Sequence, residues 1–263
     1  MKPADRRGAW ALWLSRIALS LALGGVAAAL IAALGTGAGT WSFRAGLGVL
    51  PFALFAAIGG AVLAIVAFLL GRNTGVSTGA MNAIALVVAV LFTAYLGRQI
   101  AIARSVPAIH DVATDLQDLP QFRTLSVRPD NLANVPDGGR PELAALSPEN
   151  RWKALHREAY GDLRPLRLAA APAQVLQQAE RLARERRWAV ARVDPQAGTL
   201  EATATTLFFR FKDDVVIRVR PDPARAGGAV VDMRSLSRVG GSDVGVNAKR
   251  IRAFLRDLQA AVG

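Results

Sequence analysis

Residues 45–71 read AGLGVLPFALFAAIGGAVLAIVAFLLG, without a single charged side chain. Two further uncharged runs flank this stretch, at residues 17–43 and 73–97. Each run exceeds the roughly 20 residues that an α-helix needs to cross the hydrocarbon core of a bilayer. We therefore predict a membrane domain over residues 1–98, with three transmembrane helices at about 17–35, 49–70 and 80–97.

The first apolar run leaves two interpretations of the N-terminus open. Lys2, Arg6 and Arg7 form a basic segment before it, and small residues end it, as in a cleaved signal peptide. A retained helix with its basic end inside gives three crossings, and a cleaved one leaves two crossings that start outside. In both cases the residues after 98 are expected on the outer side.

Basic residues set the expected orientation, because they concentrate on the cytoplasmic side of membrane helices. An orientation with the N-terminus inside places more basic residues inside than outside: Lys2, Arg6, Arg7, Arg16 and Arg72 against Arg44, Arg98 and Arg104. We expect a multi-pass protein of the bacterial inner (cytoplasmic) membrane, with a cytoplasmic N-terminus and a periplasmic C-terminal domain. The lipid bilayer is then one expected partner.

Composition excludes several classes of site. The chain has no cysteine, which rules out disulfides and thiolate chemistry, and its two histidines, His110 and His156, are far apart. We therefore expect no metal site and no cofactor. Of the formal net charge of +12, +7 falls in residues 1–104, so much of the basic character belongs to segments that flank the membrane helices. No basic recognition pattern accompanies it, and nucleic-acid binding is not expected.

The C-terminal half begins with little regular structure. Proline, asparagine and glycine recur through residues 99–148, which we predict to be an extended linker and loop. Residues 149–263 are predicted to form a soluble α+β domain. Apolar side chains at helical spacing predict helices over about 149–159, 172–187 and 244–262.

From Trp188 onward the apolar period changes to two, which is typical of strands. The predicted strands are 188–193, 199–205, 207–211, 215–220 and 229–235. Short turns at 195–198, 212–214 and 221–228 connect them, and this assigns Asp213 and Asp214 to a tight turn. The expected fold is an antiparallel sheet with helices packed on one face.

Three blocks of the sequence suggest a family. They are ARSVPAIHDVATD at 103–115, EATATTLFFRFKDDVVIRVRP at 201–221 and VDMRSLSRVGGSDVGVNAKRIRAFL at 231–255. Together they resemble the domain of unknown function 1499 family (DUF1499). The resemblance implies a membrane-anchored bacterial protein, and it carries no activity.

A polar cluster follows the third apolar run and includes His110, Asp111 and Asp115. A histidine beside carboxylates can perform general acid–base work. The same residues can equally cap backbone amides in an extended segment. These are weak catalytic candidates, because no nucleophile or oxyanion site accompanies them.

A second cluster lies between the last predicted strand and the last predicted helix. Backbone amides at a helix start can hold an anion, and arginines add bidentate donors for carboxylate or phosphate. Helix capping and ordinary ion pairing would also explain these residues. The candidate ligand-binding residues are Arg234, Ser235, Ser237, Arg238, Ser242, Asp243 and Asn247.

Three functions remain open. The leading hypothesis is a non-catalytic envelope module that binds a small anionic ligand or an envelope protein through residues 234–247. The alternative is a membrane-tethered, hydrolase-like enzyme that uses His110 and Asp111. The third is a scaffold whose membrane helices associate with a larger complex, where Gly24, Gly25, Gly59 and Gly60 would allow close packing.

Overall fold

The computed structural model describes residues 3–262. The chain divides into two compact units, which we describe separately. The first comprises the N-terminal helices up to Ala101 together with Leu207–Arg210, and the second comprises Ile102–Thr206 together with the chain from Phe211.

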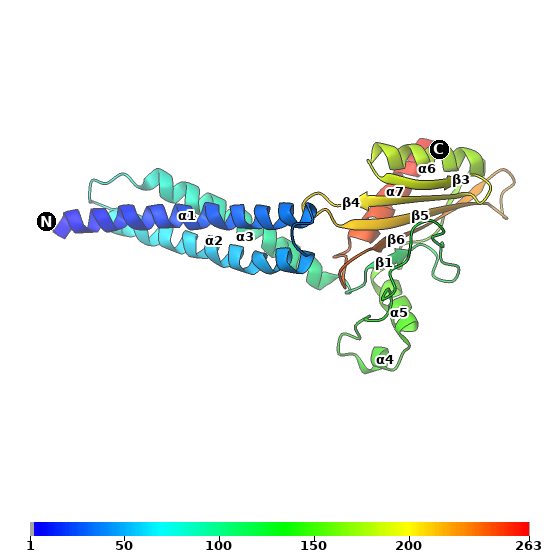
Figure 1. Ribbon diagram of the computed structural model, residues 1–263, viewed down its shortest axis with the longest axis horizontal. Helices are drawn as coiled ribbons and strands as arrows, with labels where there is room; N and C mark the ends of the chain where they lie inside the picture. The colour runs from blue at the N-terminus through cyan, green and yellow to red at the C-terminus, as the bar shows by residue number, and fades with distance from the viewer. Residues whose placement is uncertain (1–2, 263) are drawn as a thin grey trace. The chain divides into compact units, whose positions relative to one another are not determined.

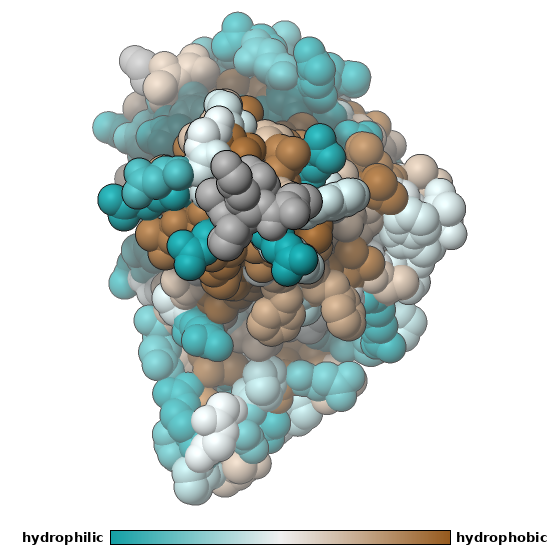
Figure 2. All heavy atoms as spheres, turned by 90° about the vertical axis from the view of Figure 1, so that its left-hand side faces the viewer, coloured by the Kyte–Doolittle hydropathy of each residue, from teal (hydrophilic) through white to brown (hydrophobic). Residues whose placement is uncertain are grey.

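Three long apolar helices make up most of the first unit: α1 (Pro3–Gly37), α2 (Phe43–Gly71) and α3 (Gly79–Ser105). Each is long and apolar enough to cross a membrane, and at most 28% of its most apolar stretch is buried inside the protein. Hydrophobic side chains, brown in Figure 2, gather on the sides of these helices, as a surface that faces lipid requires. The structure therefore confirms three helices that are long and apolar enough to cross a membrane.

Small residues form the contact between the helices. Buried alanines cluster from all three helices: Ala18 and Ala22 of α1, Ala57 and Ala64 of α2, and Ala85 and Ala89 of α3.

Two of the four glycines singled out in the sequence bring α1 and α2 close together. A Cβ atom on Gly25 would lie 2.6 Å from the carbonyl oxygen of Ala53, and one on Gly60 would lie 2.8 Å from that of Ala18. Gly24 and Gly59 have nothing within 4 Å of such a Cβ in the described part of the chain.

The second unit is built on a six-stranded antiparallel sheet (Figure 1). Its main order is β1-β6-β5-β4-β3, and β2 also pairs with β6. The strands are β1 (Asp111–Ala113), β2 (Leu166–Leu168), β3 (Ala189–Asp194), β4 (Thr199–Thr205), β5 (Lys212–Pro221) and β6 (Ala229–Ser237). β3 to β6 form a meander, because each pairs with the next along the chain.

Helices cover one face of this sheet. α6 (Pro172–Glu185) and α7 (Val246–Val262) present amphipathic faces to it, and α5 (Pro148–Tyr160) joins the same core; α4 (Pro141–Ala144) is a single turn before α5. Val215 and Ile217 of β5 belong to one hydrophobic core with Val175 of α6 and with Ile251 and Phe254 of α7. The α+β class with helices on one face is therefore confirmed.

The prediction for residues 207–214 was wrong in two respects. Leu207–Phe211 is the connection between β4 and β5, not a strand, and residues 212–214 form the first part of β5, not a turn. Asp213 pairs with Ala204 and Asp214 with Thr203 in the β4–β5 ladder. The polar sequence Lys-Asp-Asp can continue a strand here because both carboxylates meet arginines inside the domain.

Residues 99–148, predicted as linker and loop, supply part of the sheet. β1 pairs with the last part of β6, so that Asp111 lies opposite Leu236 and Ala113 opposite Arg234. The pairing brings the segment that follows α3 to the C-terminal cluster, more than a hundred residues later in the chain.

Candidate functional site

The face of the sheet opposite α6 and α7 is strongly polar. Alternation along the strands places Glu201 and Thr203 of β4, Asp214 and Arg218 of β5, and Asp232 and Arg234 of β6 on this face. The chain between β1 and α4 crosses it and is bound to it by hydrogen bonds.

Asp111 and Arg234 form the best-buried ion pair on this face. Nε and Nη2 of Arg234 donate to the two carboxylate oxygens of Asp111 at 2.9 and 2.7 Å. The amide of Asn131 donates to Oδ2 of Asp111 at 2.6 Å, and Nη1 of Arg234 donates to the carbonyl oxygen of Pro120 at 3.3 Å. Both charged groups are thus satisfied within the protein, and the pair joins β1, β6 and the crossing segment.

Glu201 holds the crossing segment through its backbone. Its carboxylate, 2% exposed, accepts from the backbone N–H groups of Arg123 at 2.8 Å, Thr124 at 3.0 Å and Leu125 at 2.7 Å. Three converging amides replace the water that a buried carboxylate loses. Glu201 was not among the residues predicted from the sequence.

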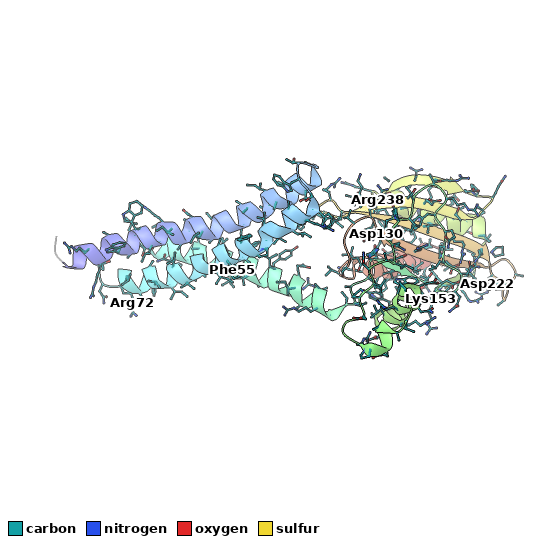
Figure 3. All side chains as sticks on the ribbon, turned by 60° about the horizontal axis from the view of Figure 1, so that its bottom comes forward. Phe55, Arg72, Asp130, Lys153, Asp222 and Arg238 are labelled. Atoms are coloured by element: carbon teal, nitrogen blue, oxygen red, sulfur yellow. The ribbon has the colours of Figure 1, made fainter. Side chains whose placement is uncertain are left out.

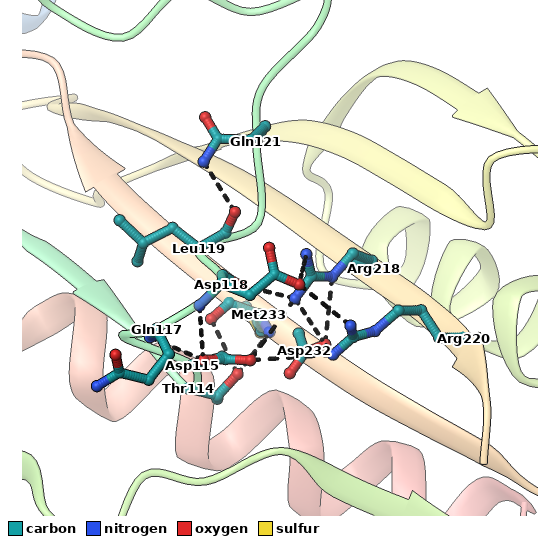
Figure 4. A network of polar contacts seen from close by, with 10 residues as sticks. All are labelled: Thr114, Asp115, Gln117, Asp118, Leu119, Gln121, Arg218, Arg220, Asp232 and Met233. Carbon is teal, nitrogen blue, oxygen red and sulfur yellow. Dashed lines mark hydrogen bonds and ion pairs between the residues drawn. The ribbon is translucent and has the colours of Figure 1, made fainter. Parts of the chain in front are cut away.

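A denser network lies further along the same face (Figure 4). The fully buried Asp232 accepts from Arg218 at 3.1 Å and from Arg220 at 2.7 Å. Arg218 and Arg220 also reach Asp118, at 2.9 and 3.1 Å. Asp115 lies 3.8 Å from Arg218, and its Oδ1 accepts from the backbone amides of Gln117 and Asp118. The candidate Asp115 therefore caps a turn and faces arginine.

The other side of β6 carries a second polar network beneath α7. Asn247 connects it: its Oδ1 accepts from the hydroxyl of Ser235 at 2.7 Å, and its Nδ2 donates to Ser237 Oγ and to the carbonyl oxygen of His110, both at 3.0 Å. Arg250 also donates to Ser235 and forms an ion pair with Asp213 at 2.5 Å. Ser235, Ser237 and Asn247 are buried and bond to one another, so the structure uses them to attach α7 to the sheet.

Ser242 and Asp243 act at the start of α7. The hydroxyl of Ser242 accepts from the N–H of Val244, and Asp243 accepts from the N–H groups of Gly245 at 2.9 Å and Asn247 at 2.7 Å. Burial raises the pKa of Asp243, and the two backbone hydrogen bonds oppose that rise. These contacts are those of a helix cap.

Both histidines of the chain are buried. His110 is buried, and its Nε2 has no hydrogen-bond partner among the described residues. His156 accepts a hydrogen bond at Nε2 from the N–H of Ala113 at 3.2 Å and lies between Trp152 and Tyr160. Burial lowers the pKa of His156 to about 4, which keeps the imidazole neutral as this acceptor role requires.

The accessible part of the candidate cluster is Arg238. Its Nε and Nη2 donate to the two oxygens of Asp214, each at 2.8 Å, and Nη2 also donates to Thr203 at 3.1 Å. These bonds fix the plane of the guanidinium, and its side chain remains 41% exposed. Within residues 3–262, Nη1 of Arg238 makes no hydrogen bond.

Arg238 lies on a hollow of about 460 Å³ between the crossing segment and the sheet. Arg128 lines the same hollow and is held by Asp130 through two bonds of 2.6 Å and by the carbonyl oxygen of Gly240 at 2.7 Å. The hydrogen bond from Arg128 lowers the pKa of the Asp130 carboxyl to about 2. The remaining lining residues are Thr124, Leu125, Ser126, Val127, Pro129, Asp214 and Leu236.

The structure thus divides the predicted site residues into groups with different surroundings. Arg234 meets Asp111, and Ser242 and Asp243 cap α7. Asn247 bonds to Ser235, to Ser237 and to the carbonyl oxygen of His110. Of the seven ligand-binding candidates, Arg238 alone lines the hollow. Its neighbour Arg128 was missed, because its position in a proline-containing loop gave no periodic signal.

The carboxylates of Asp111, Asp214 and Asp213 each pair with an arginine side chain. In the described part of the chain, no group of three or more histidine, cysteine, aspartate or glutamate side chains is arranged to hold a metal ion. The hollow is lined by two arginines whose guanidinium groups are oriented by carboxylates, by the hydroxyl-bearing residues Thr124 and Ser126, and by Asp214, whose carboxylate is already paired.

A family model described as "Protein of unknown function (DUF1499)" matches residues 111–258, from the first residue of β1 into the last turns of α7. The search of curated proteins returned no match.

Proposed function

The chain belongs to the DUF1499 family, a family of unknown function, and from that premise we propose that it is a membrane-anchored, non-catalytic binding module. Its ligand is a small anion, held in the hollow beside Arg238 and Arg128. The single observation that carries this proposal is a pair of guanidinium groups, each oriented by a carboxylate, in the wall of one accessible hollow.

The size and the chemistry of the hollow support this assignment. Its volume of about 460 Å³ falls within the roughly 300–1,000 Å³ of small-molecule sites. Arginine binds carboxylate and phosphate through two parallel hydrogen bonds, and a guanidinium that is already oriented loses less side-chain entropy on binding. Nη1 of Arg238 and the hydroxyls of Thr124 and Ser126 are the donors that we assign to the ligand.

The other candidates then have supporting roles. They connect β6, α7 and the segment after α3, and so hold the end of the strand that Arg238 directly follows. These residues are Arg234, Ser235, Ser237, Ser242, Asp243 and Asn247.

We also propose that the domain lies in the periplasm of a bacterium, with the N-terminus in the cytoplasm. The bias of basic residues along the first 104 residues supports this orientation. Reporters fused after Gly263, one active only in the cytoplasm and one only after export, test it. An exported signal is expected, and a cytoplasmic signal would reverse the orientation and move the search for ligands to cytosolic anions.

Binding is tested with inorganic phosphate and citrate as probes on the detergent-solubilised full chain, by calorimetry. We expect binding that Arg128→Ala weakens about tenfold, the loss of one good charge-assisted contact. Arg128→Ala suits this purpose because its partner Asp130 is half exposed and tolerates the loss. Arg225→Ala, in an exposed loop at the other end of the sheet, is the control. Equal affinity in the two variants, or no binding of either anion, would contradict the proposal.

A further inference from the structure

The large apolar side chains that lie exposed outside the helical segment 3–105 gather at one end of the sheet. Among the described residues beyond 105 they are Val127, Leu207, Phe208, Val239 and Val246. Leu207 is 79% exposed and Phe208 is 50% exposed, both at the tip of the β4–β5 connection. A soluble surface rarely carries such a group of apolar side chains without a partner.

The pairing of the strands fixes which end this is. One row of residues runs across the sheet from Asp111 of β1 through Leu236 of β6 and Asp214 of β5 to Thr203 of β4. β4 ends and β5 begins two residues beyond this row, so Leu207 and Phe208 project past it. Val239 follows the last residue of β6, at the same end of the sheet. The side chain of Arg128 donates to the carbonyl oxygen of Gly240, which keeps Arg128 and its neighbour Val127 at this end too.

The chain enters the domain at this same end. α3 ends at Ser105 and β1 begins at Asp111, so the five residues between them span at most about 20 Å. The N–H of Asp243 donates to the carbonyl oxygen of Ile109 at 3.1 Å, which holds the entering segment beside the start of α7 and Val246. The apolar end of the sheet is therefore tethered by a short segment to a membrane-spanning helix.

The opposite end of the sheet has a different surface. Its loops are residues 195–198 and 222–228, with the sequences Pro-Gln-Ala-Gly and Asp-Pro-Ala-Arg-Ala-Gly-Gly. Neither contains a large apolar side chain. In Figure 3, Arg238 and Asp130 are labelled toward one end of the domain and Asp222, in the loop 222–228, toward the opposite end.

We propose that the apolar end of the sheet is a membrane-contact surface, and that Leu207 and Phe208 insert into the interfacial layer of the bilayer that holds α1 to α3. Apolar side chains at a surface flanked by basic residues are the pattern of interfacial insertion. Arg210 and Lys212 follow the tip directly, and the exposed Arg187 precedes the start of β3 at the same edge. Their charges complement the phosphates of anionic lipids.

The bilayer is preferred to a second protein as the occupant because the tether already presents this end to it. The short connection from α3 gives a high effective concentration of membrane at the tip, so that two apolar side chains suffice for contact. The inference does not depend on a ligand in the hollow beside Arg238.

The natural absence of cysteine allows a direct test on the full chain. Phe208→Cys carries a fluorescent nitrobenzoxadiazole label, and Ala226→Cys, in the exposed loop at the opposite end, is the matched control. The proteins are reconstituted in vesicles of phosphatidylethanolamine and phosphatidylglycerol. Spin-labelled lipids quench a label that touches lipid, and iodide quenches a label in water. We expect lipid quenching at position 208 to exceed that at 226 several-fold, and iodide quenching to show the reverse order.

Two outcomes would overturn the proposal. Iodide quenching at 208 equal to that at 226 would place the tip in water. Shielding from both quenchers would mean that protein, not lipid, covers it. Leu207→Cys repeats the measurement at a second exposed position, so the result does not depend on whether one variant folds.

Discussion

The carboxylate of Asp111 and the guanidinium of Arg234 form a two-bond ion pair, at 2.9 and 2.7 Å, between strands that are more than a hundred residues apart in the chain. Because both side chains are buried, neither charge can turn to water if its partner is lost. Together with the bonds to Asn131 and Pro120, the pair therefore joins β1, β6 and the segment that crosses the polar face.

Replacing Asp111 with alanine should destabilise the domain by about 3–5 kcal/mol, because it leaves Arg234 charged and unpaired in the interior. Asp118→Ala is the control: its carboxylate also meets arginines but is 62% exposed, and exposed pairs contribute about 1 kcal/mol or less. Urea unfolding of the detergent-solubilised full chain measures both. Equal unfolding midpoints for the two variants would show that the buried pair has no special role.

Replacing Glu201 with glutamine should loosen the segment that crosses the polar face. The side-chain amide would direct N–H groups at the backbone N–H groups of Arg123, Thr124 and Leu125, which now converge on a carboxylate. An unmet buried donor costs about 1–3 kcal/mol. Limited trypsin digestion should therefore cut after the exposed Arg123 faster than in the wild-type chain. Glu142→Gln, on the exposed surface of α4, should leave the rate unchanged.

Asp213 and Glu201 show which parts of the structure the sequence predicts and which it does not. Three charge-free runs and the change to period two were enough to predict the three long apolar helices and the meander. The polar sequence Lys212-Asp213-Asp214 predicts a turn, whereas in the structure Arg250 and Arg238 neutralise the two carboxylates from distant positions. The role of Glu201 cannot be predicted from the local sequence, because its partners are backbone amides more than seventy residues earlier. Local pattern therefore predicts elements, and it does not reveal which buried charges have partners.

Stability should fall as the pH drops from about 6.5 to about 4, through His156. Burial lowers its folded pKa from 6.5 to about 4, so within this range the unfolded chain binds a proton that the folded chain does not. The stabilisation is therefore fully present above the unfolded pKa and is lost as the pH falls to the folded pKa. It amounts to at most about 3 kcal/mol. His156→Gln retains an acceptor for the N–H of Ala113 and removes the titrating group.

Thermal unfolding followed across this range measures the effect. The wild-type midpoint should decrease between pH 6.5 and 4, and the His156→Gln midpoint should change much less. The pKa of Asp162 is lowered by the hydrogen bond from Arg252, and that of Asp222 by the backbone N–H of Ala224. Both residues lose their stabilisation only below about 3.8, outside this range. The same decrease in both proteins would show that another group titrates.

Two adjacent glycines of α2 should respond differently to valine. A Cβ on Gly60 would lie 2.8 Å from the carbonyl oxygen of Ala18 and 2.9 Å from the backbone nitrogen of Ala22. Gly60→Val must therefore separate α1 from α2, at a cost of about 1–3 kcal/mol or more. Gly59→Val meets nothing within 4 Å in the described chain and should leave the unfolding midpoint in detergent unchanged. Equal losses would contradict the close packing at Gly60. If Gly59→Val folds normally but removes co-purifying proteins, its open face contacts a partner, and the scaffold alternative gains its first support.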